Sequence, residues 1–364
     1  MLDMIAPSTR RLTAPLPPSL AAELIGRSFI APHSLSPRAF NDLINFALAL
    51  KNGHVYVGQP LLGKTVALIF FNPSLRTRSS MAVAIHQLGG HPLVLDVGGG
   101  VWGVEWREGA VMDGDKAEHI KEMAPVIGSY ADICAVRCFP AMQSYADDAS
   151  EPVMTAFQRL SGKPLINLES SLHHPCQALG DMMTIKEHLG PLTGRKVVLA
   201  WAYHPKALPL AVPNSFVSAA ALAGAHITIA APPEFSLEPQ FLADTKAWAR
   251  AGGGDVVTTT DRDAALADAQ VVYAKSWVAL PHYGKTAEEH AVRTNYKHWT
   301  FDDAAFAKAP TAKFMHCLPV RRNVEVSDGV LDSPRSLVIP EAANRLHGQK
   351  ALLAAMALAN GGRS

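Results

Sequence analysis

The residues best suited to chemistry lie together in Ser74–Arg78, which reads Ser-Leu-Arg-Thr-Arg. The serine and threonine hydroxyls can donate hydrogen bonds, and the guanidinium groups of Arg76 and Arg78 suit phosphate oxygens. The segment follows an apolar run, 64–69, that is typical of a buried parallel strand, and it precedes 80–88, whose apolar residues recur at helical spacing. A helix N-terminus attracts anions because its first N–H groups are unpaired. The pattern predicts a phosphate site; the alternative is a capped helix start with surface arginines.

Further polar groups follow other apolar runs. Arg137 ends the run 133–137, and the run 164–169 leads to His174-Pro-Cys-Gln177, which opens a long helical segment. The carboxyl ends of parallel strands form the ligand-binding edge of open α/β sheets, although Arg137 could also be a surface side chain. The imidazole of His174 and the amide of Gln177 can polarise a carbonyl oxygen on which negative charge builds.

Strands and helices alternate along the whole chain of 364 residues. Further strands are expected at 92–97, 196–201, 226–231, 256–258 and 271–273, and further helices after 37 and over 116–127. This alternation predicts an α/β protein with two doubly wound parallel-sheet domains and an active site in the cleft between them.

Composition excludes several classes of protein. The chain has 33 Lys+Arg and 32 Asp+Glu, so no overall field would recruit nucleic acid or a membrane surface. It has no apolar run of about 18 residues and no signal-peptide core at its N-terminus. Four cysteines are too few for a disulfide scaffold, and a cytoplasmic location is expected. His173, His174 and Cys176 lack a complementary pair at zinc-finger spacing, so no metal is expected.

Gly98, Gly100 and Gly103 fit the spacing of a dinucleotide-binding loop, which would indicate a nicotinamide oxidoreductase. That motif needs a helix that begins at its glycines, and the residues after Gly100 have no helical periodicity. A flexible loop that carries Trp102 outward is the favoured interpretation.

Three motifs together resemble one family. Ser74–Arg78 matches the Ser-x-Arg-Thr-Arg motif of the aspartate/ornithine carbamoyltransferases, His174–Gln177 matches their His-Pro-x-Gln, and His316–Pro319 reads the His-Cys-Leu-Pro of the ornithine type. The resemblance spans about residues 28–358 and includes every phosphate ligand, which argues against a non-catalytic paralogue. It implies that an amine attacks carbamoyl phosphate with no cofactor, metal or covalent intermediate.

The resemblance also assigns domains and site residues. Separately, the prolines at 7, 15, 17 and 18 predict a loosely ordered N-terminal extension over 1–27. The resemblance implies a carbamoyl-phosphate domain over 28–176, an acceptor domain over 177–345 and a C-terminal helix, 346–364, that packs back on the first domain. It implies a homotrimer in which Trp102 enters the neighbouring active site. The carbamoyl-phosphate ligands would be Ser74, Leu75, Arg76, Thr77, Trp102, Arg137, His174, Gln177, Cys317, Leu318 and Arg345. Of these, Arg76, Thr77, Arg137, His174, Gln177 and Cys317 would be catalytic.

The acceptor follows from a missing carboxylate. Ornithine enzymes carry an Asp-rich stretch that pairs with the free α-amine, whereas 201–209 here contains no acidic residue. An acylated α-amine needs no such partner, so the chain resembles the acyl-ornithine branch of the family, which acts in arginine biosynthesis. In that branch the acceptor ligands would be Glu169, His204, Lys275, Arg321 and Ala117.

Three features favour N-succinylornithine over N-acetylornithine as the acceptor. Ala117 stands where acetyl-type members have glutamate, Pro209 stands where they have asparagine, and the spacing from Glu169 to His174 follows the longer succinyl-type form. The expected product is N-succinyl-L-citrulline, and N-acetyl-L-ornithine is the alternative acceptor. Glu325 occupies a position that is lysine in acetyl-type members, a departure that would alter the charge of the pocket.

Overall fold

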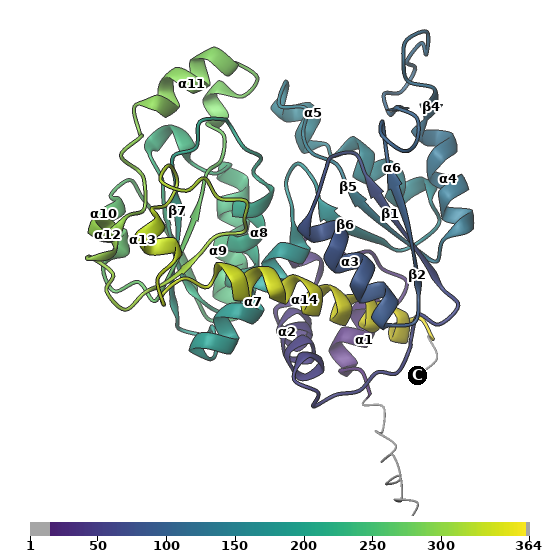
Figure 1. The fold of residues 1–364 in the computed structure, drawn as a ribbon, viewed down its shortest axis with the longest axis horizontal. Coiled ribbons are helices and arrows are strands. Elements are labelled where there is room, and N and C mark those ends of the chain that lie inside the picture. Colours follow the sequence, from purple (N-terminus) through teal and green to yellow (C-terminus); the bar gives the residue numbers. More distant parts are fainter. Residues whose placement is uncertain (1–14, 362–364) are drawn as a thin grey trace, which may run out of the picture.

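Two all-parallel sheets, one in each half of the chain, form the framework of the structure, a computed structural model that describes residues 15–361 (Figure 1). The first sheet has the order β2-β1-β5-β6 and the second β11-β10-β7-β8-β9, while β3 and β4 form a small parallel pair. Helices cover both sheets, so the expected α/β fold class is confirmed. The strands are β1 Thr65–Phe70, β2 His91–Asp96, β3 Val104–Glu105, β4 Glu118–His119, β5 Ile133–Arg137, β6 Leu165–Glu169, β7 Lys196–Trp201, β8 His226–Ala230, β9 Asp255–Thr259, β10 Val271–Lys275 and β11 Lys313–Met315.

The helices connect these strands and pack on the sheets. They are α1 Pro18–Leu24, α2 Pro37–Lys51, α3 Arg76–Gln87, α4 Ile120–Tyr130, α5 Tyr145–Ala149, α6 Pro152–Leu160, α7 Pro175–Leu189, α8 Ala211–Leu222, α9 Pro239–Gly252, α10 Arg262–Leu266, α11 Thr286–Thr294, α12 Asp303–Phe306, α13 Asp328–Leu331 and α14 Val338–Ala359. Within residues 15–361, none is both long and apolar enough to cross a membrane.

The register of the central strands brings polar side chains to one edge. β5 and β6 are buried along their whole length, as expected of apolar strands covered on both faces. Phe70 pairs with Arg137, and Arg137 pairs with Glu169, so three strands end side by side. In the second sheet Lys275 pairs with Trp201 at the corresponding edge.

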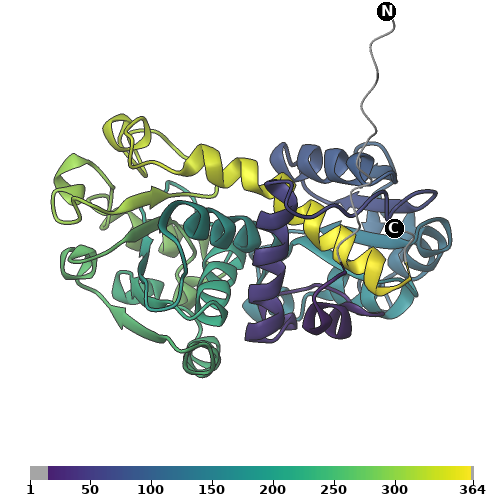
Figure 2. The same ribbon diagram turned by 90° about the horizontal axis from the view of Figure 1, so that it is seen from below.

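Two helices, α7 and α14, link the two lobes (Figures 1 and 2). α7 follows β6 of the first sheet and leads to β7 of the second, and its residues 175–185 are all buried. α14 runs from β11 back across the first lobe, where it packs against α1, α2, α3 and α7. The two inner domain boundaries expected from the sequence, 176/177 and 345/346, therefore fall inside helices that both lobes share.

Local structure differs from the sequence-based expectations at two places. The extension over 1–27 was expected to be loosely ordered, but 18–24 form α1, whose Leu20 and Leu24 are buried; residues 1–14 lie outside the described range. The helix expected over 116–127 begins only at Ile120. Glu118 and His119 instead pair with β3, and the His119 side chain caps α4 by accepting from Lys121 N–H.

The lobes also meet between α5 and the segment that precedes α11. Tyr283, in the second lobe, donates its hydroxyl to Asp148 of α5 at 2.7 Å, and its ring lies edge-on to Tyr145 at 5.5 Å between centroids. Asp148 also accepts from the N–H groups of Ala141 and Met142, both at 2.8 Å. The next residue, Gly284, has φ +79°, and a Cβ there would lie 2.1 Å from the Gln143 carbonyl oxygen.

We predict that Gly284→Ala weakens this contact between the lobes. The left-handed backbone costs an alanine about 1–2 kcal/mol, and the clash with Gln143 adds about 1–3 kcal/mol. Gly253→Ala is the matched control, because Gly253 has φ +86° but open space at its Cβ. Chemical denaturation should show the larger loss of unfolding free energy for Gly284→Ala. Equal losses in the two variants would mean that the lobes do not need this close approach.

Candidate active site

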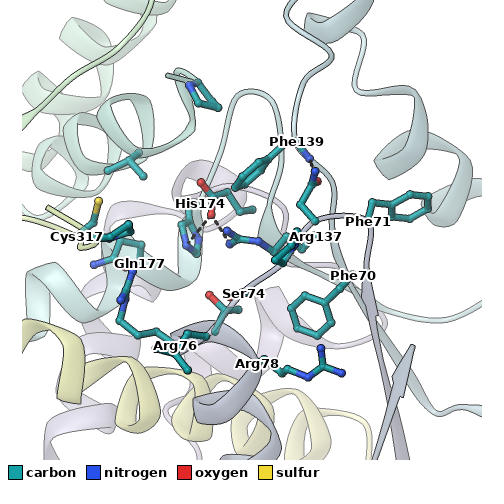
Figure 3. A pocket seen from close by; sticks show the side chains of 18 of the residues that line it. Phe70, Phe71, Ser74, Arg76, Arg78, Arg137, Phe139, His174, Gln177 and Cys317 are labelled. Carbon is teal, nitrogen blue, oxygen red and sulfur yellow. Dashed lines mark hydrogen bonds and ion pairs between the residues drawn. The ribbon is translucent and has the colours of Figure 1, made fainter. Parts of the chain in front are cut away.

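A cavity of 1090 Å³ lies between the carboxyl ends of the two sheets (Figure 3). It contains most of the side chains that the sequence singled out, although they come from distant parts of the chain. They are Ser74, Leu75, Arg76, Thr77, Arg137, Glu169, His174, Gln177, His204, Lys275, Cys317, Leu318 and Arg345. Trp102, Ala117 and Arg321 do not line it.

One end of the cavity, the first or phosphate end, is built around the start of α3. Arg76 and Thr77 are the first residues of this helix, and no side chain caps it at Leu75, so its N–H groups remain directed toward the cavity end. Arg345 of α14 donates to the Thr77 hydroxyl at 2.8 Å and to the Gln177 amide oxygen at 2.5 Å. Burial lowers the pKa of Arg345, but arginine remains charged in proteins. This end is therefore a buried, positively charged site that suits an anion.

The two arginines of the motif differ in environment. Arg78 donates from both terminal nitrogens to Asp96, each at 2.6 Å, and extends toward Phe70 and away from His174 (Figure 3). The expectation that Arg78 also grips phosphate therefore does not hold in this structure, because the strand register places Asp96 beside Phe70. Arg76 faces the centre instead, and its charge contributes to a lowered pKa of His174.

Arg137 and His174 lie on one wall (Figure 3), where both contact Glu169. Arg137 donates from Nη1 to Glu169 Oε2 and stacks on Phe139, with Cζ 4.4 Å from the ring centroid. His174 Nε2 lies 3.4 Å from the same carboxylate oxygen. Buried Arg137 Nε has no partner among the described residues, so the guanidinium retains a donor. Burial first, and then the charges of Arg345, Arg137 and Arg76, hold the pKa of His174 well below its usual value. A neutral imidazole can donate one hydrogen bond to a carbonyl oxygen.

Gln177 is oriented differently from the sequence-based expectation. Its Nε2 donates to Asp181 Oδ1 at 2.8 Å and to Glu341 Oε1 at 3.1 Å, and its Oε1 accepts from Arg345. Both amide N–H donors are used, so Gln177 has none left to polarise a carbonyl oxygen. The remaining lone pair of Oε1 can accept from an –NH₂ group. Sequence reasoning missed Asp181 and Glu341; the signal for Asp181 was its i+4 spacing from Gln177 in an otherwise apolar stretch.

The turn after β11 carries Cys317 and Leu318. Burial raises the pKa of the Cys317 thiol to about 12, which makes it a poor nucleophile. Leu318 has φ +53°, and its N–H donates to His316 Nδ1 at 3.0 Å. The turn thus contributes shape and main-chain groups to the cavity.

The opposite end of the cavity, the second or acceptor end, is formed by the loops after β7 and β10. His204 and Lys275 are polar, whereas Leu208, Pro209 and Val212 form an apolar wall. His204 Nε2 accepts from Arg321 Nε at 2.9 Å, so its proton lies on Nδ1, which faces the Lys206 carbonyl oxygen at 2.8 Å. Arg321 therefore reaches the cavity through His204.

Glu325 supports the loop that carries Arg321. Its Oε2 accepts from the Arg321 N–H at 2.8 Å, and its Oε1 lies 3.5 Å from His316 Nε2. Burial opposes ionisation of this carboxyl, but His316, Lys275 and the Arg321 N–H outweigh it and lower its pKa to about 2. Glu325 is therefore a buried anion behind the acceptor end.

Trp102 and Ala117 are exposed and do not line the cavity of their own chain, although Gly98, Gly99 and Gly100 just before Trp102 do. Gly98 begins a tight turn closed by a bridge between Val97 and Val101, so no helix starts at the glycines and the nicotinamide alternative loses its structural basis. Trp102 is 66 % exposed, as expected of an outward-facing residue. Within residues 15–361, no three metal-ligating side chains come together.

Comparison with known proteins gives consistent matches over both lobes. Residues 27–187 match the carbamoyl-P binding domain of aspartate/ornithine carbamoyltransferases, and residues 210–356 match the Asp/Orn binding domain. The chain is 43% identical to the N-acetylornithine carbamoyltransferase of Xanthomonas axonopodis pv. citri, over 91% of this chain and 96% of that protein. It is 41% identical to the N-succinylornithine carbamoyltransferase of Bacteroides thetaiotaomicron, over 78% of this chain and 84% of that protein.

Solved structures agree with these sequence matches. A structure of acetylornithine transcarbamylase complexed with acetylcitrulline superposes with a TM-score of 0.87 at 40% identity, covering 91% of this chain and 99% of that one. A glutamate-to-alanine mutant of N-acetyl-L-ornithine transcarbamylase, complexed with carbamyl phosphate and N-succinyl-L-norvaline, has the same TM-score at 41% identity and the same coverage.

We predict that Arg76→Ala weakens anion binding far more than Arg78→Ala. Loss of a charge-assisted contact in a buried site costs about 2–4 kcal/mol, or roughly 30- to 1,000-fold in binding. Arg78 already pairs with Asp96, so its removal should cost less than about fivefold. Calorimetric titration with inorganic phosphate measures both, with thermal unfolding as the check on folding. Similar losses in the two variants would place the anion elsewhere.

Proposed function

Since this chain belongs to the aspartate/ornithine carbamoyltransferase family, we propose that it transfers the carbamoyl group of carbamoyl phosphate to the side-chain amine of N2-succinyl-L-ornithine. The products would be N-succinyl-L-citrulline and phosphate, in arginine biosynthesis. The observation that carries the acylated acceptor is the cationic and apolar second end of the cavity. There His204, Lys275 and Arg321 stand beside an apolar wall, and 201–209 contain no carboxylate for a free α-amine.

The donor would bind at the first end of the cavity. Phosphate oxygens would be held by the start of α3, with the Ser74 hydroxyl, Arg76, Thr77 and Arg345, and Leu75 would contribute main-chain contact. Arg137 and neutral His174 would donate to the carbonyl oxygen, where charge increases as the amine attacks. Gln177 Oε1 would accept from the carbamoyl –NH₂, and the turn at Cys317–Leu318 would confine the group.

The reaction needs only positioning and charge stabilisation from these residues. The neutral side-chain amine of the acceptor attacks the carbonyl carbon, a C–N bond forms, and the bond from carbon to the phosphate oxygen breaks. The amine loses one proton and the leaving phosphate gains one, so protons balance. Negative charge develops on the carbonyl oxygen and on the leaving phosphate as the amine attacks. Positive charge from Arg76, Arg137 and Arg345 therefore stabilises the transition state more than the bound substrates.

Glu169 would have a double role. In this structure its carboxylate neutralises Arg137, so the arginine is kept in place before a ligand arrives. When the carbamoyl group binds, Arg137 can still use its unpaired Nε, while Glu169 stands at the junction of the donor and acceptor ends. This position suits a contact with the acyl-ornithine amide or amine hydrogens.

Succinyl is preferred because of Ala117, Pro209 and the Glu169–His174 spacing. A succinyl group ends in a carboxylate, which suits the cations at the acceptor end. The glutamate-to-alanine mutant of the related acetyl-type enzyme was crystallised with an N-succinyl compound, which agrees with loss of a glutamate favouring succinyl. N-acetyl-L-ornithine is the second candidate, because the N-acetylornithine carbamoyltransferase of Xanthomonas axonopodis pv. citri matches 91% of the chain, against 78% for the succinyl-type relative.

We also propose the assembly and the division into domains. Trp102 would enter the site of a neighbouring subunit in a homotrimer, since large apolar side chains on its segment, Val111 and Met112 among them, are exposed. The donor domain would be 28–176 and the acceptor domain 177–345, with 346–364 packed on the first. The cytoplasmic location expected from the sequence stays a prediction.

A parallel assay tests the acceptor. Carbamoyl phosphate is offered with ornithine, N-acetylornithine and N-succinylornithine, and kcat/KM is measured for each. We expect N-succinylornithine to give the highest value and ornithine to give almost none, because nothing at 201–209 can pair with its α-amine. Highest activity with ornithine would refute the acylated acceptor, and highest activity with N-acetylornithine would refute only the succinyl assignment.

Ala117 lies on the same exposed segment as Trp102, so we propose that it too reaches the acyl group in the site of a neighbouring subunit. Ala117→Glu should then reverse the acyl preference. A glutamate ~4 Å from the succinyl carboxylate would repel it by up to about 4 kcal/mol at an effective dielectric of ~20, and a third of that is about tenfold in preference. Ala117→Gln is the matched control, since it adds the same bulk without the charge. The measured quantity is the ratio of kcat/KM for the two acylated acceptors. An unchanged ratio in Ala117→Glu, or the same shift in Ala117→Gln, would show that charge at this position does not select the acyl group.

Subunit mixing tests the shared site. Trp102→Ala chains and Arg137→Ala chains should each be inactive alone, whereas hybrid trimers contain sites with an intact Arg137 and a neighbour's intact Trp102. Activity should therefore return after the two variants are mixed and exchange subunits. Each variant unfolded and refolded alone is the control, and no recovery after exchange proven by mass spectrometry would count against the arrangement.

A further inference from the structure

Behind Gln177, two carboxyl groups meet at the junction of the helices that link the lobes. Asp181 lies on α7 and Glu341 on α14, and both are fully buried. Gln177 Nε2 donates to both of them, at 2.8 and 3.1 Å. The second oxygen of Glu341 accepts from the His316 N–H at 2.9 Å. The proposed reaction gives neither carboxyl a role.

These contacts determine which way the Gln177 amide points. A flipped amide would set its oxygen against two carboxyl groups and its –NH₂ against the Arg345 guanidinium, which has only donors. The observed orientation satisfies all three neighbours at once. Gln177 Oε1 is therefore held on the side of Arg345 and the cavity.

The same contacts leave too few donors for two ionised carboxylates. The charge of Arg345 is near, but its hydrogen bonds go to Gln177 and Thr77, and buried Asp181 Oδ2 has no partner among the described residues. The Tyr273 hydroxyl of β10 also faces the pair, since burial and then the charges of Asp181, Cys317 and Glu341 raise its pKa, but this buried hydroxyl has no hydrogen-bond partner among the described residues either. Burial raises the pKa of Asp181 to about 7, and burial and the Asp181 charge raise the pKa of Glu341 well above its usual value. One proton between the two groups would supply a donor and leave a single negative charge opposite Arg345.

We propose that Asp181 and Glu341 share one proton and act as positioning residues, which hold both Gln177 Oε1 and the turn at His316–Leu318 toward the carbamoyl group. The inference rests on the proposed carbamoyl transfer. Through Gln177 the pair is joined to Arg345 and Thr77, and through Glu341 to the His316 main chain. One network thus sets the spacing of the groups that would surround the donor.

Amide substitutions of Asp181 and Glu341 distinguish a pair that shares one proton from a pair in which both carboxyl groups are ionised. Asp181→Asn or Glu341→Gln alone keeps one carboxylate and one donor, as in a pair that shares a proton. Each single variant should therefore keep kcat within about fivefold of wild type. The double variant has no charge and an excess of donors, so one amide must turn; its kcat should fall at least tenfold beyond the product of the two single effects. KM for the acceptor should change less than about threefold, since the acceptor end is untouched.

Infrared spectroscopy reports the proton directly. Wild type should show the C=O band of a buried protonated carboxyl group, and this band should be absent from both single variants. Thr184→Val is the structural control, because it removes a buried hydrogen bond from Asn344 in the same interface of α7 and α14 without contact to Gln177. It should lower the thermal midpoint and leave kcat and the infrared band as they are.

Each result bears on the proposal separately. If both single variants lose more than about a hundredfold in kcat while they remain folded, or if the band persists in both, the carboxyl groups do not share a proton. If the double variant is as active as the single ones, the network does not position Gln177. A wrong acceptor would instead abolish turnover in every protein, wild type included, and leave the infrared result and the calorimetric binding of carbamoyl phosphate intact.

Discussion

Arg345 lies buried between Thr77 and Gln177 and donates to both, so one side chain of α14 fixes the start of α3 relative to the start of α7. A buried charge is costly unless its donors are satisfied, and here the cost is offset by a helix whose inner face is buried over several turns. The site is therefore charged and rigid before any ligand arrives. The cationic groups lose most of their hydration when the protein folds. An anion that binds later therefore does not bear that desolvation cost.

The net charge of the chain is only +1, but the cavity is strongly positive. Arg76, Arg137, Lys275 and Arg345 line it, against the single lining carboxylate of Glu169, apart from the half-exposed pair of Arg78 and Asp96. Concentration of cations between low-dielectric walls focuses the field on the cleft. A phosphate at one end and an acyl carboxylate at the other would both gain from this field, which suits a reaction between two anions that otherwise repel each other.

Much of this site could be predicted from the sequence, because short motifs follow buried strands and parallel strands end at one edge. The motif Ser74–Arg78, Arg137, Glu169 and His174 all reached the cavity for that reason. The orientation of Gln177 could not be predicted, since it depends on Glu341, 164 residues away. The pairing of Arg78 with Asp96 depends on strand register, and the late start of α4 depends on a two-residue pairing with β3. Local patterns carry no information about such contacts.

The contact between Thr77 and Arg345 joins residues 268 positions apart. During synthesis the first lobe can form its sheet long before α14 exists. Its phosphate end would then lack Arg345, and the apolar surfaces of α2, α3 and α7 that α14 covers would be exposed. An N-terminal fragment that stops before Val338 would thus contain every strand of both sheets and expose apolar surface in place of an active site. Such a fragment is a natural target for chaperones and proteases, so the topology couples catalytic competence to completion of the fold.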